Sequence, residues 1–363
     1  MSILELAQPP TDAVSSVSFS PDNNTLIVTS WNTHGAIHVY RRTESSPPFE
    51  LASTIAASAP ILDACFGSDS DHIYTVGLDR TTTRYNLSQG ADSKEVLSKA
   101  SRPTNKVAFS SEHNVVLSIS WNATLMIHDA ENKKFLAIPL AAKPFALSLT
   151  ADKAVVTMAE RKVHVYALAD LKPLIGQVGS ASGLQEVLLQ ARPWQERESS
   201  LKFMTRATAT MPDGTGFAVS SIEGRVGVEW FDEEENKNMY AFKCHRDKST
   251  SVNADGQEVP IDIIYPVNAV AFHPVHGTFA TGGGDGVVAL WDAKTKRRIR
   301  QYPKLPACVA AMQFSSDGKY LAIGISPGFE DGKEADPTDP ELVKVYVREL
   351  GESEAKGKPA KGK

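Results

Sequence analysis

The side chains best suited to bind a charged ligand are cations that gather in one part of the chain. A guanidinium can hold a phosphate or a carboxylate through two parallel hydrogen bonds, and an ammonium adds a point charge beside it. Residues 220–230 (SSIEGRVGVEW) alternate as a strand does. The cluster indicates an anion site or, alternatively, solvated surface charges that pair with Glu223 and Glu229. Its members are Arg206, Arg225, Lys243, His245 and Arg246.

Two tryptophans stand in the same short context, the tripeptide SWN. They are Trp31 and Trp121. A tryptophan contributes a large apolar area with few rotatable bonds, which makes it a favoured anchor for a binding partner. If both indoles lie on the surface, they form an apolar platform. The alternative is that they pack between neighbouring structural elements.

Motifs of enzyme chemistry do not occur in the sequence. Residues 282–286 (GGGDG) lack the Lys-Ser/Thr pair that completes a phosphate-binding P-loop. His273 and His276 have no cysteine or carboxylate neighbour at metal-ligand spacing. The G-x-S-x-G, H-E-x-x-H and kinase motifs are also missing. We therefore expect no catalytic site, no metal and no cofactor.

One pattern recurs seven times along the chain. It consists of an alternating apolar strand, a polar turn, a second apolar strand, a tight turn and a third strand that often ends in an aromatic residue. The clearest copy, VNAVAFHPVHGTFATGGGDGVVALWDA from Val267, contains a Trp-Asp dipeptide. The pattern resembles the WD-repeat family, whose blades are four-stranded sheets. The other copies start at Val14, Ile61, Asn105, Ala146, Ala207 and Val309.

The polar residue of the tight turn keeps one register in six copies. Its positions are Asn32, Asp79, Asn122, Glu160, Glu223 and Asp285. Trp31 and Trp121 come directly before it, where the other copies carry Leu78, Ala159, Ile222 and Gly284. Since one register in a propeller corresponds to one face, both tryptophans should lie on the same rim, near the central channel.

The predicted fold is all-β: a single seven-bladed β-propeller over residues 1–350. A lone four-stranded unit cannot bury both of its apolar faces, whereas seven units packed around an axis bury every face. The seventh copy lacks a fourth strand, so residues 3–6 should supply it and close the ring. The tail at 351–363 (GESEAKGKPAKGK) has low complexity and is predicted to be disordered.

Three segments are too long for the repeat. Residues 168–200 and 232–264 flank the fifth unit, and each carries roughly twenty extra residues. In the first, LQEVLLQ from Leu184 predicts a short helix. In the second, DKSTSVNADGQEVP has loop composition. The third segment, 327–341, is an acidic loop with proline and glycine.

Composition narrows the class of protein and its partners. Hydrophobic residues make up 42% of the 363 residues, enough for a large ordered core. A net charge of −5 argues against a protein that coats nucleic acid, so no direct contact with nucleic acid is expected. No window approaches 18 consecutive apolar residues and no signal peptide is apparent, so we expect a nuclear or cytoplasmic protein without a membrane partner.

Four strings carry a resemblance to a narrower family. They resemble the WD-repeat spindle-checkpoint proteins that partner Bub-family kinases, and the sister family of WD-repeat messenger-RNA export factors. IEGRV and FKCHR are specific to this pair of families, whereas RESSLK and the SPGFEDG loop (326–332) resemble the checkpoint member. The resemblance covers almost the whole propeller, although 168–200 is longer than the family norm. The strings are RESSLKFMTR (197–206), SSIEGRVGVEWFD (220–232), YAFKCHR (240–246) and IYPVNAVAFHPVHGTFATGGGDGVVALWD (264–292).

This resemblance implies two binding sites on one face. Trp31, Trp121 and Arg206 match the family positions that bind the GLEBS segment of checkpoint kinases and related checkpoint proteins. In that match, Arg206 meets an acidic residue of the segment. Arg225 and Lys243 match the positions that contact phosphothreonine in phosphorylated MELT repeats of the kinetochore scaffold protein.

The implied function is that of a non-enzymatic spindle assembly checkpoint adaptor, a monomeric propeller within hetero-complexes. His245 and Arg246 are expected to support the phosphate site. The implied location is the nucleus and, in mitosis, the kinetochore, with a cytoplasmic pool. The main alternative is a GLEBS-binding export factor of the nuclear pore that contacts RNA. A substrate receptor of a ubiquitin ligase is another, but no ligase-docking element stands outside the propeller.

Overall fold

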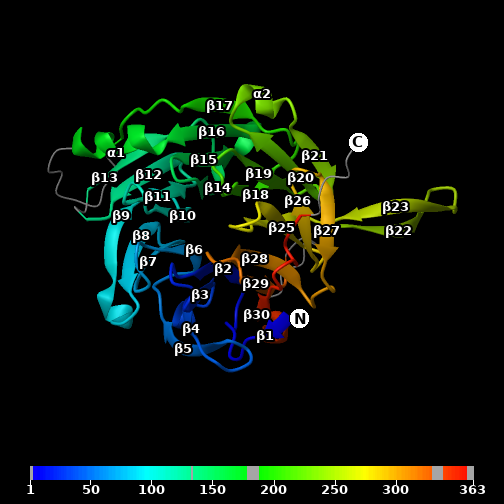
Figure 1. Ribbon diagram of the computed structural model, residues 1–363, viewed down its shortest axis with the longest axis horizontal. Helices are drawn as coiled ribbons and strands as arrows, with labels where there is room; N and C mark the ends of the chain where they lie inside the picture. Colours follow the sequence, from blue (N-terminus) through cyan, green and yellow to red (C-terminus); the bar gives the residue numbers. More distant parts are fainter. Residues whose placement is uncertain (1–2, 132–133, 178–187, 329–337, 358–363) are drawn as a thin grey trace.

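The computed structural model describes residues 3–131, 134–177, 188–328 and 338–357. In this part of the chain, seven four-stranded antiparallel sheets surround a central channel (Figure 1). In six of them the first strand of a repeat lies innermost and the next three follow outward in chain order. The structure thus confirms the all-β, seven-bladed propeller that the repeats predict.

The first four blades cover the N-terminal half of the chain. Their strands are β2 (Val14–Phe19), β3 (Thr25–Ser30), β4 (Ile37–Arg42) and β5 (Phe49–Ile55); β6 (Ile61–Phe66), β7 (His72–Gly77), β8 (Thr81–Asn86) and β9 (Glu95–Lys99); β10 (Thr104–Ser110), β11 (Val115–Ser120), β12 (Thr124–Asp129) and β13 (Phe135–Pro139); and β14 (Pro144–Leu149), β15 (Lys153–Met158), β16 (Lys162–Ala167) and β17 (Gln195–Glu198).

Three further blades complete the ring. Their strands are β18 (Thr205–Thr210), β19 (Gly216–Ser221), β20 (Arg225–Trp230) and β21 (Tyr240–Lys243); β24 (Val267–Phe272), β25 (Thr278–Gly283), β26 (Val288–Asp292) and β27 (Arg297–Gln301); and β28 (Cys308–Phe314), β29 (Tyr320–Ser326), β30 (Lys344–Glu349) and β1 (Ile3–Glu5). Short 3₁₀ turns lie at Thr33–Gly35, Gly90–Ser93, Ala159–Arg161 and Pro340–Leu342.

The N-terminal strand closes the ring. β1 pairs antiparallel with β30, with Leu4 opposite Val347, and the Leu6 N–H donates to the Val345 carbonyl at 2.8 Å. The Leu6 side chain is buried. As predicted, the seventh blade therefore combines three strands from the end of the chain with one from its start, which ties the two ends of the propeller together.

The core lies between neighbouring blades. β3 (TLIVTS) and β11 (VVLSIS) are buried along their whole length, because both faces of a central strand are covered. One apolar cluster joins Leu117 and Ile127 of the third blade to Val156 and Tyr166 of the fourth. Packing of this kind fixes each blade against the next, so the side chains on the rims are held in defined relative positions.

The long segments differ from the loops that the sequence predicts. The helix α1 (Leu168–Gln177) covers the outer edge of the third and fourth blades with Leu168, Leu171 and Ile175. The predicted helix at 184–190 has its first half outside the described residues, and 188–190 are not helical. Residues 232–264 form the short helix α2 (Glu233–Asn236), the outer strand β21, and a projecting hairpin of β22 (Arg246–Val252) and β23 (Glu258–Ile264) (Figure 1).

The start of the C-terminal tail packs on the propeller instead of being disordered. The Glu354 carboxylate accepts hydrogen bonds from Arg348 Nε at 2.6 Å and from the Tyr302 hydroxyl at 2.7 Å. Ala355 is buried, and its carbonyl accepts from the Thr278 hydroxyl. The prediction of disorder over 351–363 is therefore wrong for 351–357, because a buried ion pair and an apolar contact compensate the ordering entropy. Residues 358–363 lie outside the described part.

Candidate partner-binding face

One end of the propeller, here called the upper rim, collects the predicted site residues. It is the end at which each inner strand begins and each second strand ends. The strand registers establish this, since Val14 lies opposite Ser30, Thr104 opposite Ser120 and Thr205 opposite Ser221. The turns that follow those second strands therefore share the upper rim with the residues that start the inner strands.

A backbone hydrogen bond repeats at the upper rim and fixes the register of both tryptophans. The Trp31 N–H donates to the Ala13 carbonyl, and the Trp121 N–H donates to the Pro103 carbonyl, each at 3.0 Å. The same bond occurs in four other blades, from Leu78, Ala159, Ile222 and Gly284. Trp31 and Trp121 thus occupy equivalent positions on one rim, as the sequence predicts.

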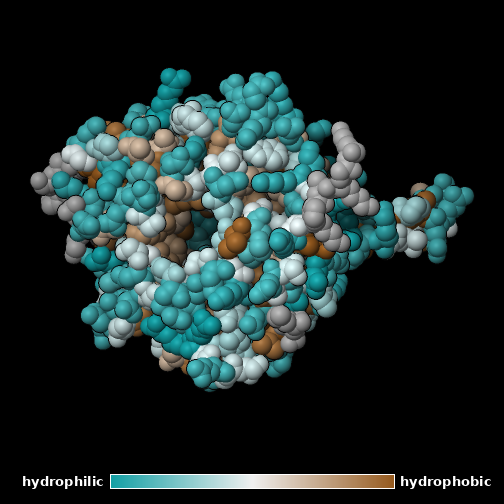
Figure 2. All heavy atoms as spheres, viewed as in Figure 1, coloured by the Kyte–Doolittle hydropathy of each residue, from teal (hydrophilic) through white to brown (hydrophobic). Residues whose placement is uncertain are grey.

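A ring of bulged residues lines the mouth of the channel at this rim. In every blade the pairing of the inner strand with the second strand shifts just after the inner strand begins, and the first residue skipped by the pairing lines a common cavity. This cavity has a volume of about 330 Å³. Figure 2 looks onto the opposite end, which carries α2 and the C-terminal segment, and shows the hollow at the centre of the propeller from that side. The seven residues are Ser15, Leu62, Asn105, Phe145, Arg206, Asn268 and Ala310.

Trp31, Trp121 and Arg206 line this same cavity. The Trp31 residue is 42% exposed, so it does not serve to fill a gap between blades. The Trp121 ring is partly exposed and carries the Lys143 ammonium 4.7 Å from its centroid. Both indoles therefore offer apolar surface at the channel mouth, where a partner segment can cover it.

Arg206 supplies the positive charge of the cavity. It is exposed, and its Nε and Nη2 donate to Asn268 Oδ1 at 3.1 and 2.9 Å. These two bonds hold the guanidinium across the junction between the fifth and sixth blades. Within the described residues no carboxylate lies within ion-pair distance of it. A cation fixed in position but unneutralised is suited to an acidic group of a partner.

Arg225 and Lys243 form a separate cationic pair on the fifth blade. They are direct partners across β20 and β21, so their side chains leave the same face of the sheet side by side. Arg225 Nε lies 3.3 Å from Glu223 Oε1, whereas exposed Lys243 has no ion-pair partner among the described residues. Like charges placed directly opposite repel each other, and the carboxylates of Glu223 and Asp262 offset only part of that repulsion. A doubly charged anion would be stabilised between the two cations.

His245 does not support an anion site, contrary to the sequence-based expectation. The residue is buried, and its Nδ1 lies 2.9 Å from Asp285 Oδ1 while its Nε2 lies 2.8 Å from the Thr281 hydroxyl. The Trp291 indole N–H donates to the same hydroxyl at 2.9 Å. This chain of hydrogen bonds joins the end of the fifth blade to the sixth, which leaves the imidazole no free edge for a phosphate.

We expect His245→Ala to destabilise the fold by about 3 kcal/mol, because it leaves the Asp285 carboxylate and the Thr281 hydroxyl buried without their partner. Urea unfolding followed by far-ultraviolet circular dichroism measures the change. His34→Ala, which removes an exposed imidazole on the upper rim, is the control and should change stability by less than about 0.5 kcal/mol. Equal stabilities of the two variants would refute the structural role.

Arg246 also has a role within the fold. Its Nη2 donates to the Glu223 carbonyl at 2.8 Å, and its Nη1 lies 4.0 Å from Asp262 Oδ2 of the hairpin. The side chain is only 14% exposed. It therefore joins the base of the β22–β23 hairpin to the tight turn that precedes Arg225, and it helps to position that turn without facing a ligand.

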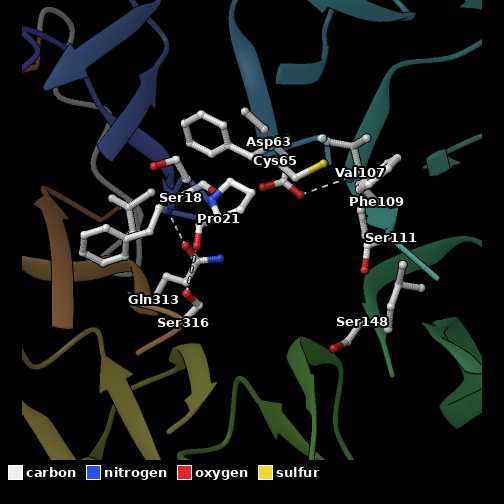
Figure 3. A pocket seen from close by; sticks show the side chains of 18 of the residues that line it. Ser18, Pro21, Asp63, Cys65, Val107, Phe109, Ser111, Ser148, Gln313 and Ser316 are labelled. Atoms are coloured by element: carbon white, nitrogen blue, oxygen red, sulfur yellow. Dashed lines mark hydrogen bonds between the residues drawn. The ribbon is translucent and has the colours of Figure 1, made fainter. Parts of the chain in front are cut away.

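The opposite end of the channel holds a second cavity, of about 550 Å³ (Figure 3). Two of its polar side chains join neighbouring blades: Asp63 Oδ2 accepts from the Val107 N–H at 3.1 Å, and Gln313 Oε1 accepts from the Phe19 N–H at 2.6 Å. Burial raises the pKa of the Asp63 carboxyl, and the nearby Lys106 ammonium opposes that rise. These groups serve cohesion between blades.

Residues that the sequence analysis did not single out also shape the upper rim. These include the other six bulged residues, which line the same cavity as the tryptophans: Ser15, Leu62, Asn105, Phe145, Asn268 and Ala310. Three exposed apolar residues lie beside the fifth blade, at 51%, 47% and 39% exposure. They are Phe203, Met204 and Ile222. Met204 and Ile222 are joined by a backbone hydrogen bond at the rim, so the apolar surface reaches beyond the channel mouth.

The described residues contain no cluster of three or more His, Cys, Asp or Glu side chains placed to hold a metal ion. Among the same residues, no helix has the length and apolar character needed to cross a membrane.

Comparison with known proteins assigns the chain to a family. The WD domain, G-beta repeat model matches residues 3–38 and 264–292. The mitotic checkpoint protein BUB3.1 of Arabidopsis thaliana is 35% identical over 363 residues, which cover 98% of this chain and 95% of that protein. The chain belongs to the Bub3 family of mitotic checkpoint proteins. Membership of this family supports a function in the spindle checkpoint.

Two further relatives carry different kinds of name. The spindle assembly checkpoint protein bub3 of Schizosaccharomyces pombe is 32% identical over 86% of this Bub3-family chain and 88% of that protein. The poly(A)+ RNA export protein of the same organism is 26% identical over 99% of the chain and 94% of that protein. The higher identities belong to checkpoint proteins, as the RESSLK and SPGFEDG strings indicate.

Proposed function

We propose that this Bub3-family chain is a non-catalytic adaptor of the spindle assembly checkpoint. It binds GLEBS segments of checkpoint kinases and related checkpoint proteins, and it binds phosphorylated MELT motifs of the kinetochore scaffold, which brings the kinases to unattached kinetochores. The observation that carries the proposal is the presence of two separate groups of suitable side chains on one rim. One is the cavity of Trp31, Trp121 and Arg206, and the other is the Arg225–Lys243 pair.

The channel-mouth cavity supports a site for an extended peptide. Two indoles provide apolar surface, and Arg206 provides a fixed cation at the same cavity. A segment that places an apolar side chain between the indoles and a carboxylate on Arg206 would satisfy both features. Because neither feature requires a covalent modification of the partner, binding of the segment at this cavity is constitutive.

The Arg225–Lys243 pair supports a site that depends on phosphorylation. A phosphothreonine carries close to two negative charges and three strong acceptor oxygens, whereas threonine carries no charge. Charge-assisted hydrogen bonds to a guanidinium and an ammonium are therefore made only by the modified residue. A kinase would create this interaction and a phosphatase would remove it, so kinetochore docking becomes reversible.

These sites define the expected partners and place of action. The propeller acts as a monomer within hetero-complexes, in the nucleus and cytoplasm, and on kinetochores in mitosis. Its chemistry is non-covalent binding, so the proposal involves no cofactor, no membrane and no direct contact with nucleic acid.

An mRNA export role at the nuclear pore is the second candidate, favoured by the similarity to the poly(A)+ RNA export protein. Fluorescence anisotropy separates the two roles by titrating the protein into a labelled GLEBS peptide and into labelled poly(A) RNA. We expect saturable binding of the peptide and no saturable binding of RNA at physiological salt. RNA binding that weakens steeply as salt is raised would support the export role instead.

A further inference from the structure

A half-exposed tryptophan at the opposite rim lies outside both proposed sites. This lower rim is the end at which the inner strands finish and the second strands begin. Trp194 comes from the long segment before β17 and is 49% exposed. It lines a cavity of about 440 Å³ between the fourth and fifth blades, with Phe231 on the same wall. An indole left this open on a folded surface marks a place for a binding partner.

Hydrogen bonds from β17 hold this aromatic wall in place. The two rings lie 6.2 Å apart at 64°. Gln195 Nε2 donates to the Phe231 carbonyl at 2.9 Å, and Arg197 Nη1 donates to the Trp230 carbonyl at 2.6 Å. The wall is therefore preorganised by contacts between blades, which lowers the entropic cost of binding to it.

The wall already carries a cation from the chain itself. The Lys153 Nζ lies 5.2 Å from the Trp194 ring centroid and 5.4 Å from that of Phe231. These distances are within the range of cation–π attraction. The same ammonium pairs with Asp152. The geometry thus shows that an alkylammonium fits over these rings.

The facing wall of the cavity is acidic. Asp232 caps α2 by accepting from the Glu234 and Glu235 N–H groups at 2.9 and 3.0 Å. Glu233 and Glu235 line the cavity, are exposed, and have no ion-pair partner within the described residues. A cation that enters beside Trp194 would therefore meet aromatic faces on one side and, on the other, carboxylates that make no ion pair in the described part of the chain.

We propose that this lower-rim pocket binds an arginine side chain in a basic segment of a partner protein. A planar guanidinium can lie against Trp194 and donate two hydrogen bonds to one carboxylate, which an ammonium cannot do. The occupant is basic because the charged side chains of the pocket that make no ion pair among the described residues, including Glu233 and Glu235, are acidic. Since the pocket lies on the rim opposite Trp31 and Arg225, this partner binds at the same time as the partners of the upper rim.

The test uses fluorescence anisotropy of the full chain with a fluorescein-labelled peptide, GSGRRGSG, and its uncharged match, GSGQQGSG. We expect saturable binding of the arginine peptide alone. Trp194→Ala and the double variant Glu233→Gln/Glu235→Gln should each weaken it by at least about fivefold. Lys153→Met should strengthen it, because the internal cation leaves the wall.

Lys319→Met is the matched control, since Lys319 occupies the same turn of the seventh blade and pairs with Asp317. It should leave peptide affinity unchanged. Thermal unfolding checks that each variant is folded, and the glutamate variant alters only exposed side chains. The proposal is overturned if the arginine peptide fails to saturate below about 1 mM, if the glutamine peptide binds equally, or if neither Trp194→Ala nor the glutamate variant changes the affinity.

Discussion

Replacing Arg225 and Lys243 together with alanine should abolish binding of a phosphorylated MELT peptide. The two side chains leave β20 and β21 side by side, and Lys243 makes no ion pair within the described residues. Each charge-assisted hydrogen bond to phosphate is worth roughly 1.5–3 kcal/mol, so loss of both lowers the affinity by at least about 100-fold. Calorimetric titration of the variant with the phosphopeptide measures the loss.

The same double variant should keep its affinity for a GLEBS peptide within about twofold, because the cavity of Trp31, Trp121 and Arg206 does not include either residue. The control is Arg80→Ala with Lys99→Ala, which removes two exposed cations of the second blade, one from the turn before β8 and one from β9. It should leave both affinities unchanged. Loss of both activities in a folded Arg225/Lys243 variant would contradict a two-site rim.

Trp31→Ala should weaken GLEBS binding by about 2 kcal/mol, or roughly 30-fold. The indole is 42% exposed in the free protein, so the energy of covering it is available to a partner and not already used in the core. For the same reason the variant should unfold at nearly the same denaturant concentration as the parent. Calorimetry with the GLEBS peptide and urea unfolding measure the two effects separately.

Trp194→Ala is the matched control for this prediction, because it removes an indole of similar exposure from the opposite rim. It should leave GLEBS affinity unchanged. If Trp31→Ala changed GLEBS affinity by less than about 0.5 kcal/mol, Trp31 would be a rim residue without a binding role.

The fold could be predicted because its determinants recur. Turn residues such as Asn32 and Asp285 keep one register, and each copy is too apolar to stand alone, so seven copies imply a ring. The missing fourth strand of the last copy pointed to residues 3–6, and β1 occupies that place. The same register is enough to place Trp31 and Trp121 on one rim, because equivalent turns of a propeller share a face.

The ring of bulged residues has a pattern in the sequence that differs from the strict apolar–polar alternation of a regular strand. Val14 and Val17, like Ile61 and Ala64, are apolar residues three positions apart at the start of an inner strand, where a regular strand would place them two apart. The extra residue is the bulge, and it is the one that lines the channel mouth. Searching for this spacing would have identified Asn268.

The misassignment of His245 had a different cause. In the sequence it stands between Lys243 and Arg246 and looks like part of a cationic cluster. Its partners, Asp285 and Thr281, come from the next blade, and only the packing of the fifth blade against the sixth brings them within hydrogen-bond distance. A sequence pattern cannot show that a side chain is already hydrogen-bonded to residues of a neighbouring blade.

Local composition misled the assignment of the hairpin. DKSTSVNADGQEVP is rich in turn-forming residues, yet most of it lies in the paired strands β22 and β23, which run from Arg246 opposite Ile264 to Val252 opposite Glu258. A long two-stranded ribbon gains backbone hydrogen bonds along its whole length even when its side chains are polar. Composition therefore located the turn of the ribbon but not its strands.

In the proposed function, the upper rim holds two sites, one of which binds its peptide only when a threonine is phosphorylated. The most direct measurement is calorimetric titration of the protein, already bound to a GLEBS peptide, with a MELT peptide in phosphorylated and unphosphorylated forms. We predict that only the phosphorylated peptide binds and that the bound GLEBS peptide stays in place. Equal binding of both forms, or no binding of either, would contradict a phosphorylation-dependent adaptor.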